Sequence, residues 1–157
     1  MTKYLIPIFL LFICFIMPIQ IYSIGDGIGA GVQGAFYRYQ DSSYGSSFIP
    51  VNRDVNYIIT GIYGGKTALS TLSWLIGDIM LVFATVLSLM GEKDPDDRKI
   101  KIICSFLMVS GILFLISVML QYGIFLHGDA GISMPFGVPL IVISSWYFFK
   151  MRSTLFL

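Results

Sequence analysis

The sequence predicts an all-α membrane protein, a bundle of four transmembrane helices with a small extracellular antiparallel β-sheet in the first outer loop. Three observations lead to this prediction. Of the 157 residues, 56% are hydrophobic and 12% are charged, against about 25% charged in an average soluble domain. Four long stretches are nearly free of charge, and a long polar segment separates the first two. So much apolar surface in a short chain cannot be hidden in one core, and we expect it to face lipid.

The four predicted spans cover residues 4–22, 67–90, 102–126 and 131–149 of a single membrane domain, 1–157. Each is near or above the roughly 20 residues that cross about 30 Å of hydrocarbon. A backbone in lipid must satisfy its own hydrogen bonds, which favours helices. Pro135 and Pro139 fall in the first half of the fourth span, near a helix start, where proline is tolerated.

Basic residues in the flanks predict the orientation. They lie before the first span, between the second and third, and after the fourth, at Lys3, Lys93, Arg98, Lys99, Lys101, Lys150 and Arg152. Cytoplasmic flanks are enriched in lysine and arginine. We therefore expect both termini in the cytoplasm, and the protein in the cell membrane.

The first span has a second interpretation. Residues 1–3, the apolar run and a polar exit at 20–23 also resemble a secretory signal peptide. Ile21, at the position where a small residue is usual before the cleavage site, favours retention of the span.

The outer segment, residues 23–66, is too long for a simple turn. A glycine series at 25–34 leads into the aromatic run 36–39, and a second β-branched and aromatic run covers 55–62. Two such runs separated by Asp, Ser and Gly predict an antiparallel pair of strands. The glycine series lacks the strand, helix and lysine of a phosphate-binding loop, so we interpret it as a closely packed exit from the first helix.

Asp78 lies at the centre of the second span, where a charge costs at least about 2.5 kcal/mol. One interpretation is an ion or proton site, or a contact with the cation of a partner subunit. The other is a structural carboxyl held by serine hydroxyls such as those of Ser110 or Ser117. The other spans carry no Lys, Arg, Glu or His, so the structural interpretation is favoured.

Small residues recur on the second and third spans at spacings of three, four and seven: Ser70, Ser73, Gly77 and Ala84 on one, and Ser110, Gly111 and Ser117 on the other. Such spacings place side chains on one helical face, and small side chains let membrane helices approach closely. The pattern predicts a packing seam.

Nothing in the sequence indicates a cofactor, a metal or a catalytic group. Cys14 and Cys104 lie inside apolar runs, and His127 is the one histidine, whereas a zinc site needs three or four ligands. The net charge of +1 disfavours a nucleic-acid partner, since phosphate binding needs a concentrated basic face.

The predicted topology and two short segments, Gly34-Ala35-Phe36-Tyr37-Arg38 and Val109-Ser110-Gly111-Ile112-Leu113-Phe114-Leu115, resemble the claudin and peripheral-myelin-protein group of four-span proteins. The first segment resembles the group's Gly-Leu-Trp signature, in which an aromatic residue anchors the outer loop at the membrane face. The resemblance implies that Gly34, Phe36 and Arg38 are contact residues of the outer loop. The group's paired outer-loop cysteines are absent, and Phe36 stands where its tryptophan is expected.

Together these features predict a non-catalytic membrane protein that acts through contacts with other membrane proteins. Two roles fit equally: a claudin-like structural or assembly protein, and an accessory subunit of a larger membrane complex. The alternative is a small channel or transporter that uses Asp78 as its ion or proton site.

Overall fold

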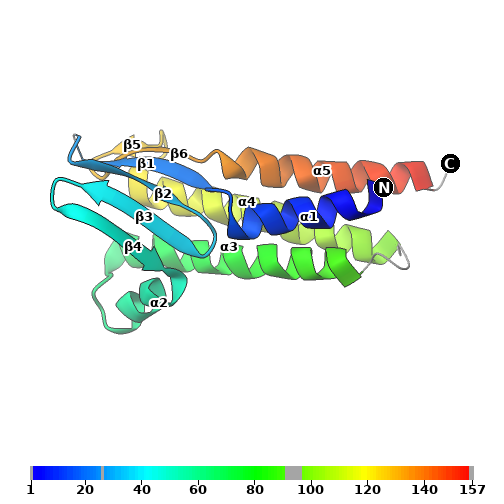
Figure 1. The fold of residues 1–157 in the computed structure, drawn as a ribbon, viewed down its shortest axis with the longest axis horizontal. Coiled ribbons are helices and arrows are strands. Elements are labelled where there is room, and N and C mark those ends of the chain that lie inside the picture. The colour runs from blue at the N-terminus through cyan, green and yellow to red at the C-terminus, as the bar shows by residue number, and fades with distance from the viewer. Residues whose placement is uncertain (1, 26, 91–96, 156–157) are drawn as a thin grey trace.

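The structure, a computed structural model, describes residues 2–25, 27–90 and 97–155. Helices run side by side along most of the molecule, and a β-sheet stands at the end farthest from both termini (Figure 1). In chain order the elements are α1 (Thr2–Phe15), β1 (Gln20–Ile24), β2 (Gly29–Gln33), β3 (Tyr37–Ser42), β4 (Gly45–Pro50), α2 (Val51–Ile59), α3 (Gly65–Met90), α4 (Asp97–Tyr122), β5 (His127–Gly128), β6 (Gly131–Met134) and α5 (Gly137–Leu155).

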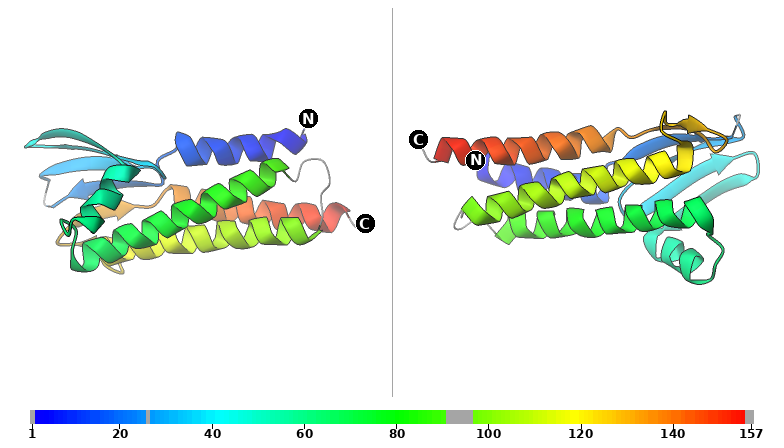
Figure 2. Two further views of the ribbon diagram at one scale, coloured as in Figure 1. Left: turned by 90° about the horizontal axis from the view of Figure 1, so that it is seen from below. Right: turned by 180° about the vertical axis from the view of Figure 1, so that it is seen from behind.

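The long helices α3 and α4 form an antiparallel hairpin. α1 packs against α3, and α5 packs against α4. Figure 2 shows α3 and α4 side by side along the molecule, with α2 beside the sheet end. Within the described ranges, two helices are long and apolar enough to cross a membrane, Gly65–Met90 and Arg98–Tyr122.

The prediction of a four-helix all-α bundle is therefore wrong. The first predicted span, 4–22, is helical only to Phe15, so α1 has 14 residues and rises about 21 Å at 1.5 Å per residue. Pro18 has no N–H to continue the helix. The chain then turns into β1, which pairs with β2 and β6.

The fourth predicted span, 131–149, fails at its beginning. Its first four residues form β6, and α5 begins only at Gly137, so its apolar part covers Gly137–Lys150. Pro135 disfavours a helical conformation at Met134, the residue before it. Gly131 has a φ of 120°, which no helix contains.

A sheet follows the first helix, but it is larger than the predicted pair. It has six antiparallel strands in the order β4-β3-β2-β1-β6-β5, so residues 127–134 extend it beyond the outer segment. The predicted strand at 55–62 is wrong, because α2 occupies Val51–Ile59. Pro50 precedes this helix in an extended conformation. Asp54 is the buried residue of the helix, whereas Val55 and Ile59 are exposed.

Candidate functional site

The inner face of the sheet, which points toward the helix ends, carries polar side chains. Gln20 on β1 donates from Nε2 to Gln33 Oε1 on β2 at 2.7 Å. Ser133 on β6 donates from Oγ to Gln20 Oε1 at 2.9 Å. All three residues are buried. Three strands are thus joined by a chain of side-chain hydrogen bonds below the sheet, where an ordinary sheet would present apolar residues to a core.

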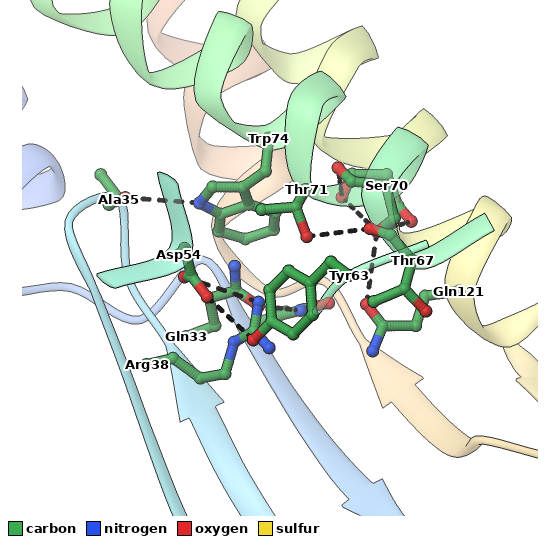
Figure 3. Close-up of polar contacts among 12 residues, drawn as sticks. Gln33, Ala35, Arg38, Asp54, Tyr63, Thr67, Ser70, Thr71, Trp74 and Gln121 are labelled. Carbon is green, nitrogen blue, oxygen red and sulfur yellow. Dashed lines mark hydrogen bonds and ion pairs between the residues drawn. The ribbon is translucent and has the colours of Figure 1, made fainter. Parts of the chain in front are cut away.

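Arg38 stands beside this polar layer and faces α2. Its Nη2 lies 3.7 Å from Asp54 Oδ2, and the two side chains are 11% and 9% exposed. Tyr63 donates its hydroxyl proton to Asp54 Oδ1 at 3.1 Å (Figure 3). In the part of the chain that the structure describes, Arg38 Nε has no hydrogen-bond partner. The guanidinium is therefore buried with a loose ion pair and an unused donor.

The carboxyl of this cluster is electrostatically perturbed. Burial raises the pKa of Asp54 above its ordinary value of 3.8, and this effect exceeds the opposing effects of the Arg38 charge and the Tyr63 hydrogen bond. Burial also raises the pKa of the Tyr63 phenol. At neutral pH the Tyr63 hydroxyl therefore keeps its proton and can donate to the Asp54 carboxylate.

A cavity of about 310 Å³ lies between the inner face and the end of α4. Its polar lining comes from three strands and one helix: Tyr22, Gln33, Arg38, Gln40, Gln121 and Tyr122. The rings of Tyr22 and Tyr122 lie 6.1 Å apart, and the hydroxyl of Tyr22 has no hydrogen-bond partner within residues 2–25, 27–90 and 97–155. Burial raises the pKa of Tyr22 to about 12, against the opposing effect of Arg38, so this phenol is neutral.

The turn at residues 34–36, which joins β2 to β3, is fixed by two aromatic side chains. Trp74 on α3, almost fully buried, donates from Nε1 to the carbonyl oxygen of Ala35 at 3.3 Å. The Phe36 ring lies 5.4 Å from that of Phe15 at the end of α1. The turn is thus held onto the helix ends from two sides.

Gly34 and Tyr37 close the same turn. Gly34 N–H donates to the carbonyl oxygen of Tyr37 at 2.8 Å, and a Cβ on Gly34 would overlap the Tyr37 ring. Tyr37 donates its hydroxyl proton to the carbonyl oxygen of Ile16 at 3.0 Å. Of the three residues expected to make outer-loop contacts, Gly34 and Phe36 thus lie in a packed turn, and Arg38 lies in the polar cluster.

The outer face of the sheet carries the apolar residues instead. Phe48 is opposite Tyr39, Tyr39 is opposite Val32, Val32 is opposite Ile21, and Ile21 is opposite Met134. Directly opposed residues share one face of a sheet. We call these five residues the outer row. Phe48 and Met134, its two ends, are each 58% exposed.

Serine and glycine join α3 to α4. Ser70 and Ser117 exchange hydrogen bonds with one another's carbonyl oxygens. Ser110 donates from Oγ to the carbonyl oxygen of Gly77 at 2.9 Å. The ring of Phe114 lies over Gly77, where an added Cβ would meet it at 3.0 Å. Four of the seven small residues predicted to form the seam, Ser70, Gly77, Ser110 and Ser117, therefore meet here, and a fifth, Ala84, is fully buried.

The other two helix-packing candidates lie elsewhere. Gly111 faces α5, because a Cβ there would meet Val142 at 3.3 Å. Ser73 is only half-buried on α3.

Asp78 is 3% exposed, and neither of its carboxyl oxygens has a hydrogen-bond partner among the described residues. The expected partners Ser110 and Ser117 donate to backbone carbonyls instead, so the prediction that they hold Asp78 is wrong. Asp78 is one turn from Leu81 and two turns from Thr85, on the face of α3 where Thr85 meets Cys14 of α1 at 3.3 Å. It therefore faces α1, about 100° around α3 from the seam.

Among the described residues no group of three or more His, Cys, Asp or Glu is placed to hold a metal ion. His127 is exposed on the edge strand β5.

Sequence reasoning missed most of the polar cluster. Asp54 and Tyr63 flank the run 55–62, and a strand over this run does not place them against Arg38. Gln33 and Gln121 carried no motif. One signal was available: the alternation Tyr37, Arg38, Tyr39 puts the charge on the face opposite the two tyrosines.

Comparison of the chain with protein-family models, with characterised proteins and with solved structures finds no match.

Proposed function

We propose that the protein is a non-catalytic integral membrane protein that acts through contacts with other membrane proteins. The α3–α4 hairpin provides the membrane anchor. Its outward side chains are large and apolar, among them Leu72, Ile76, Ile79, Phe83, Ile102, Val109, Ile112 and Ile116. In lipid this surface is solvated, whereas in water it would be a large exposed apolar patch.

The sheet is proposed to lie on the outer side of the membrane. Arg98, Lys99 and Lys101 lie at the opposite end of the hairpin, in the first turns of α4. Basic flanks favour the cytoplasmic side. Both termini are at this same end of the molecule (Figure 1), and we propose that they are cytoplasmic and that the membrane is the cell membrane.

We also propose that α1 remains part of the protein. Leu10, Ile13 and Cys14 are buried in the helix core, and Cys14 is hydrogen-bonded to Thr85 of α3. Cleavage after the first helix would uncover this face of α3. An intact mass that includes α1 in protein purified from membranes supports retention, and a mass lacking it overturns it.

The observation that carries the proposed function is the outer row. Five apolar side chains cross the sheet on the face turned away from the helices. This face lies outside the segment that α3 and α4 are proposed to anchor in the membrane. A contiguous apolar surface outside the membrane is typical of a protein-binding site. Aromatic residues and methionine, both present here, are enriched in such interfaces.

The claudin and peripheral-myelin-protein resemblance suggests that this contact has a structural or assembly role. The second proposed role is that of an accessory subunit in a larger membrane complex. Four strands of the sheet lie in the chain between α1 and α3, which supports the likeness. Purification in mild detergent separates the two roles. A homogeneous homo-oligomer supports the first, and stoichiometric co-purification of other chains supports the second.

The direct test replaces Tyr39 and Phe48 by Ser and measures cross-linking in native membranes. We expect the cross-linked species of the wild-type protein to be lost, while Tyr44→Ser leaves them unchanged. Tyr44 is the matched control because it is 91% exposed at the tip of the β3–β4 hairpin and outside the row. Equal cross-linking in the double variant and the wild type would contradict the proposal.

A second candidate function is an ion or proton site at Asp78. The observation that favours it is a buried carboxyl with two unpartnered oxygens in the middle of a membrane-capable helix, since intramembrane acids often mark ion pathways. Ion flux into liposomes containing the protein, lost in Asp78→Asn, would support it. Absence of flux in the wild type would exclude it.

A further inference from the structure

The cavity below the sheet combines a buried cation with unused hydrogen-bonding capacity. Arg38 is the one charged residue in its described lining, and the other polar groups are amides and phenols. The cavity volume of about 310 Å³ corresponds to roughly ten water molecules at about 30 Å³ each. This is also the lower end of the size range of small-molecule sites.

The guanidinium is poorly satisfied by its own surroundings. Asp54, its ion-pair partner, is 3.7 Å away, which is longer than a charge-assisted hydrogen bond. The Tyr63 hydroxyl lies closer to the Asp54 carboxyl, at 3.1 Å from Oδ1, than the guanidinium does. A buried arginine has five N–H donors to satisfy, and leaving donors unpaired in a buried site is unfavourable.

We propose that this cavity is a binding site for a phosphate or carboxylate group, with Arg38 as the residue that recognises its charge. The oxygens of the bound group complete the hydrogen bonding of the guanidinium, and the Tyr22 hydroxyl and the Gln33 and Gln121 amides supply further donors at the cavity wall. Asp54 limits the affinity, because its carboxylate competes with the ligand for the same cation.

The position of the cavity admits two sources of this chemistry. Gln121 and Tyr122 are the last residues of α4, so the cavity lies where an anchored α3–α4 hairpin leaves the hydrocarbon. Lipid headgroups lie at that level, and so does the outer aqueous phase. The ligand is thus either the phosphate of a lipid headgroup or a free anion.

The test uses the full chain purified in neutral detergent, with two probes. Inorganic phosphate is titrated by calorimetry, and retention of phosphatidylglycerol is measured by native mass spectrometry against diacylglycerol, which lacks the phosphate. Binding of phosphatidylglycerol alone identifies a lipid site, and binding of inorganic phosphate as well identifies a site for a free anion. Binding of neither probe overturns the proposal.

Substitutions then assign the site. Arg38→Gln should weaken binding at least about ten-fold, the effect of losing a hydrogen bond to a charged group. Arg53→Gln should leave it unchanged, because Arg53 lies over the Tyr57 ring on α2, outside the cavity lining. Tyr22→Phe removes only the hydroxyl and keeps the ring packing, and it should weaken binding several-fold. This variant tests the site if Arg38→Gln does not fold.

Asp54→Asn gives the sharpest result. If Arg38 serves the ion pair alone, removing the carboxylate has no effect on phosphate or phosphatidylglycerol. If the cavity binds an anion, the same substitution should tighten binding by removing the competing charge. Unchanged or weaker binding in Asp54→Asn, or equal loss in Arg38→Gln and Arg53→Gln, would overturn the assignment.

Discussion

Ser70 and Ser117 bind each other's backbone across the two long helices. Ser70 Oγ donates to the carbonyl oxygen of Ser117 at 2.9 Å, and Ser117 Oγ donates to that of Ser70 at 2.8 Å. The two hydroxyl oxygens lie 3.0 Å apart. Such a reciprocal pair fixes both the distance and the register of the hairpin, because sliding either helix by one residue breaks both bonds.

We expect Ser70→Ala and Ser117→Ala each to lower the free energy of unfolding by about 0.5 to 1.5 kcal/mol. The double variant should lose less than the sum, since each hydroxyl lies within contact of the other. Unfolding in mixed detergent micelles measures these values. Ser73→Ala, on the same helix but only half-buried, is the control, and an equal cost there would argue against a special role for the pair.

Gly77 provides the closest approach in the same seam. A Cβ at this position would meet Phe114 Cε1 at 3.0 Å, and Phe114 is fully buried against Trp74 with ring centroids 4.7 Å apart. Gly77→Val should therefore overpack the seam and cost about 1 to 3 kcal/mol.

Phe114→Leu should partly rescue Gly77→Val, because the smaller side chain leaves room for the added methyl groups. Gly64→Ala is the matched control, since a Cβ there meets nothing within 4 Å. Unfolding free energies of the single and double variants form one cycle. Additive costs for Gly77→Val and Phe114→Leu would contradict the contact.

The seam could be predicted because helix geometry is local. Spacings of three, four and seven place Ser70 and Gly77 on one face whatever the surrounding fold, and the structure puts this face against Ser110 and Ser117. Gly111 was assigned to the same seam but faces α5. A shift of one residue turns a side chain by about 100°, so adjacent residues cannot both face one neighbour.

The ends of the first and fourth predicted spans could not be found from hydropathy. Ile21, Tyr22 and Ile24 are as apolar as a helix requires, yet in β1 Ile21 lies on one face of the strand and Tyr22 and Ile24 lie on the other. Pro18 and Pro135 lie where helix and strand meet, but a proline can either end a helix or occupy its first turn. Pairing of β1 with β6 decides between them, and the two strands are far apart in sequence.

The polar cavity depends even more on long-range pairing. Its lining comes from β1, β2, β3 and α4, and its charged residue is paired with Asp54 of α2. No spacing in the sequence relates these residues. The register of three strands and the docking of a helix end bring them together.

The pH dependence of stability should report on Asp54. Its folded-state pKa is raised above 3.8 by burial, so the folded protein keeps a proton that the unfolded chain has already lost. Stability from this group is fully present below the unfolded pKa and is lost as the pH rises through the folded one. The unfolding free energy of the wild type relative to Asp54→Asn should therefore fall as the pH rises above about 3.8.

Unfolding in micelles at a series of pH values measures this difference. Asp41→Asn is the control for loss of one carboxylate, because Asp41 is exposed on the sheet. A difference that rises with pH would mean that the Arg38 charge dominates over burial at Asp54.

The sign of the stability change in Asp78→Leu tests whether the Asp78 carboxyl is uncompensated in the fold. Its carboxyl is buried and unpartnered, so Asp78→Leu removes an unfavourable burial at similar side-chain volume. We expect the free energy of unfolding to rise by about 1 to 3 kcal/mol. Thr85→Val, on the same face, should instead lower it by about 1 kcal/mol, because Thr85 is bonded to Leu81 and Cys14.

If the protein acts only through its contact surface, Asp78→Leu should cross-link to its partners in membranes like the wild type. A more stable variant that assembles but no longer supports ion flux would show that the uncompensated carboxyl is retained for transport, since no described residue of α1 or α3 is hydrogen-bonded to it. A less stable Asp78→Leu would mean that the carboxyl has a partner that stabilises the fold, which would contradict the interpretation of Asp78 as unpartnered.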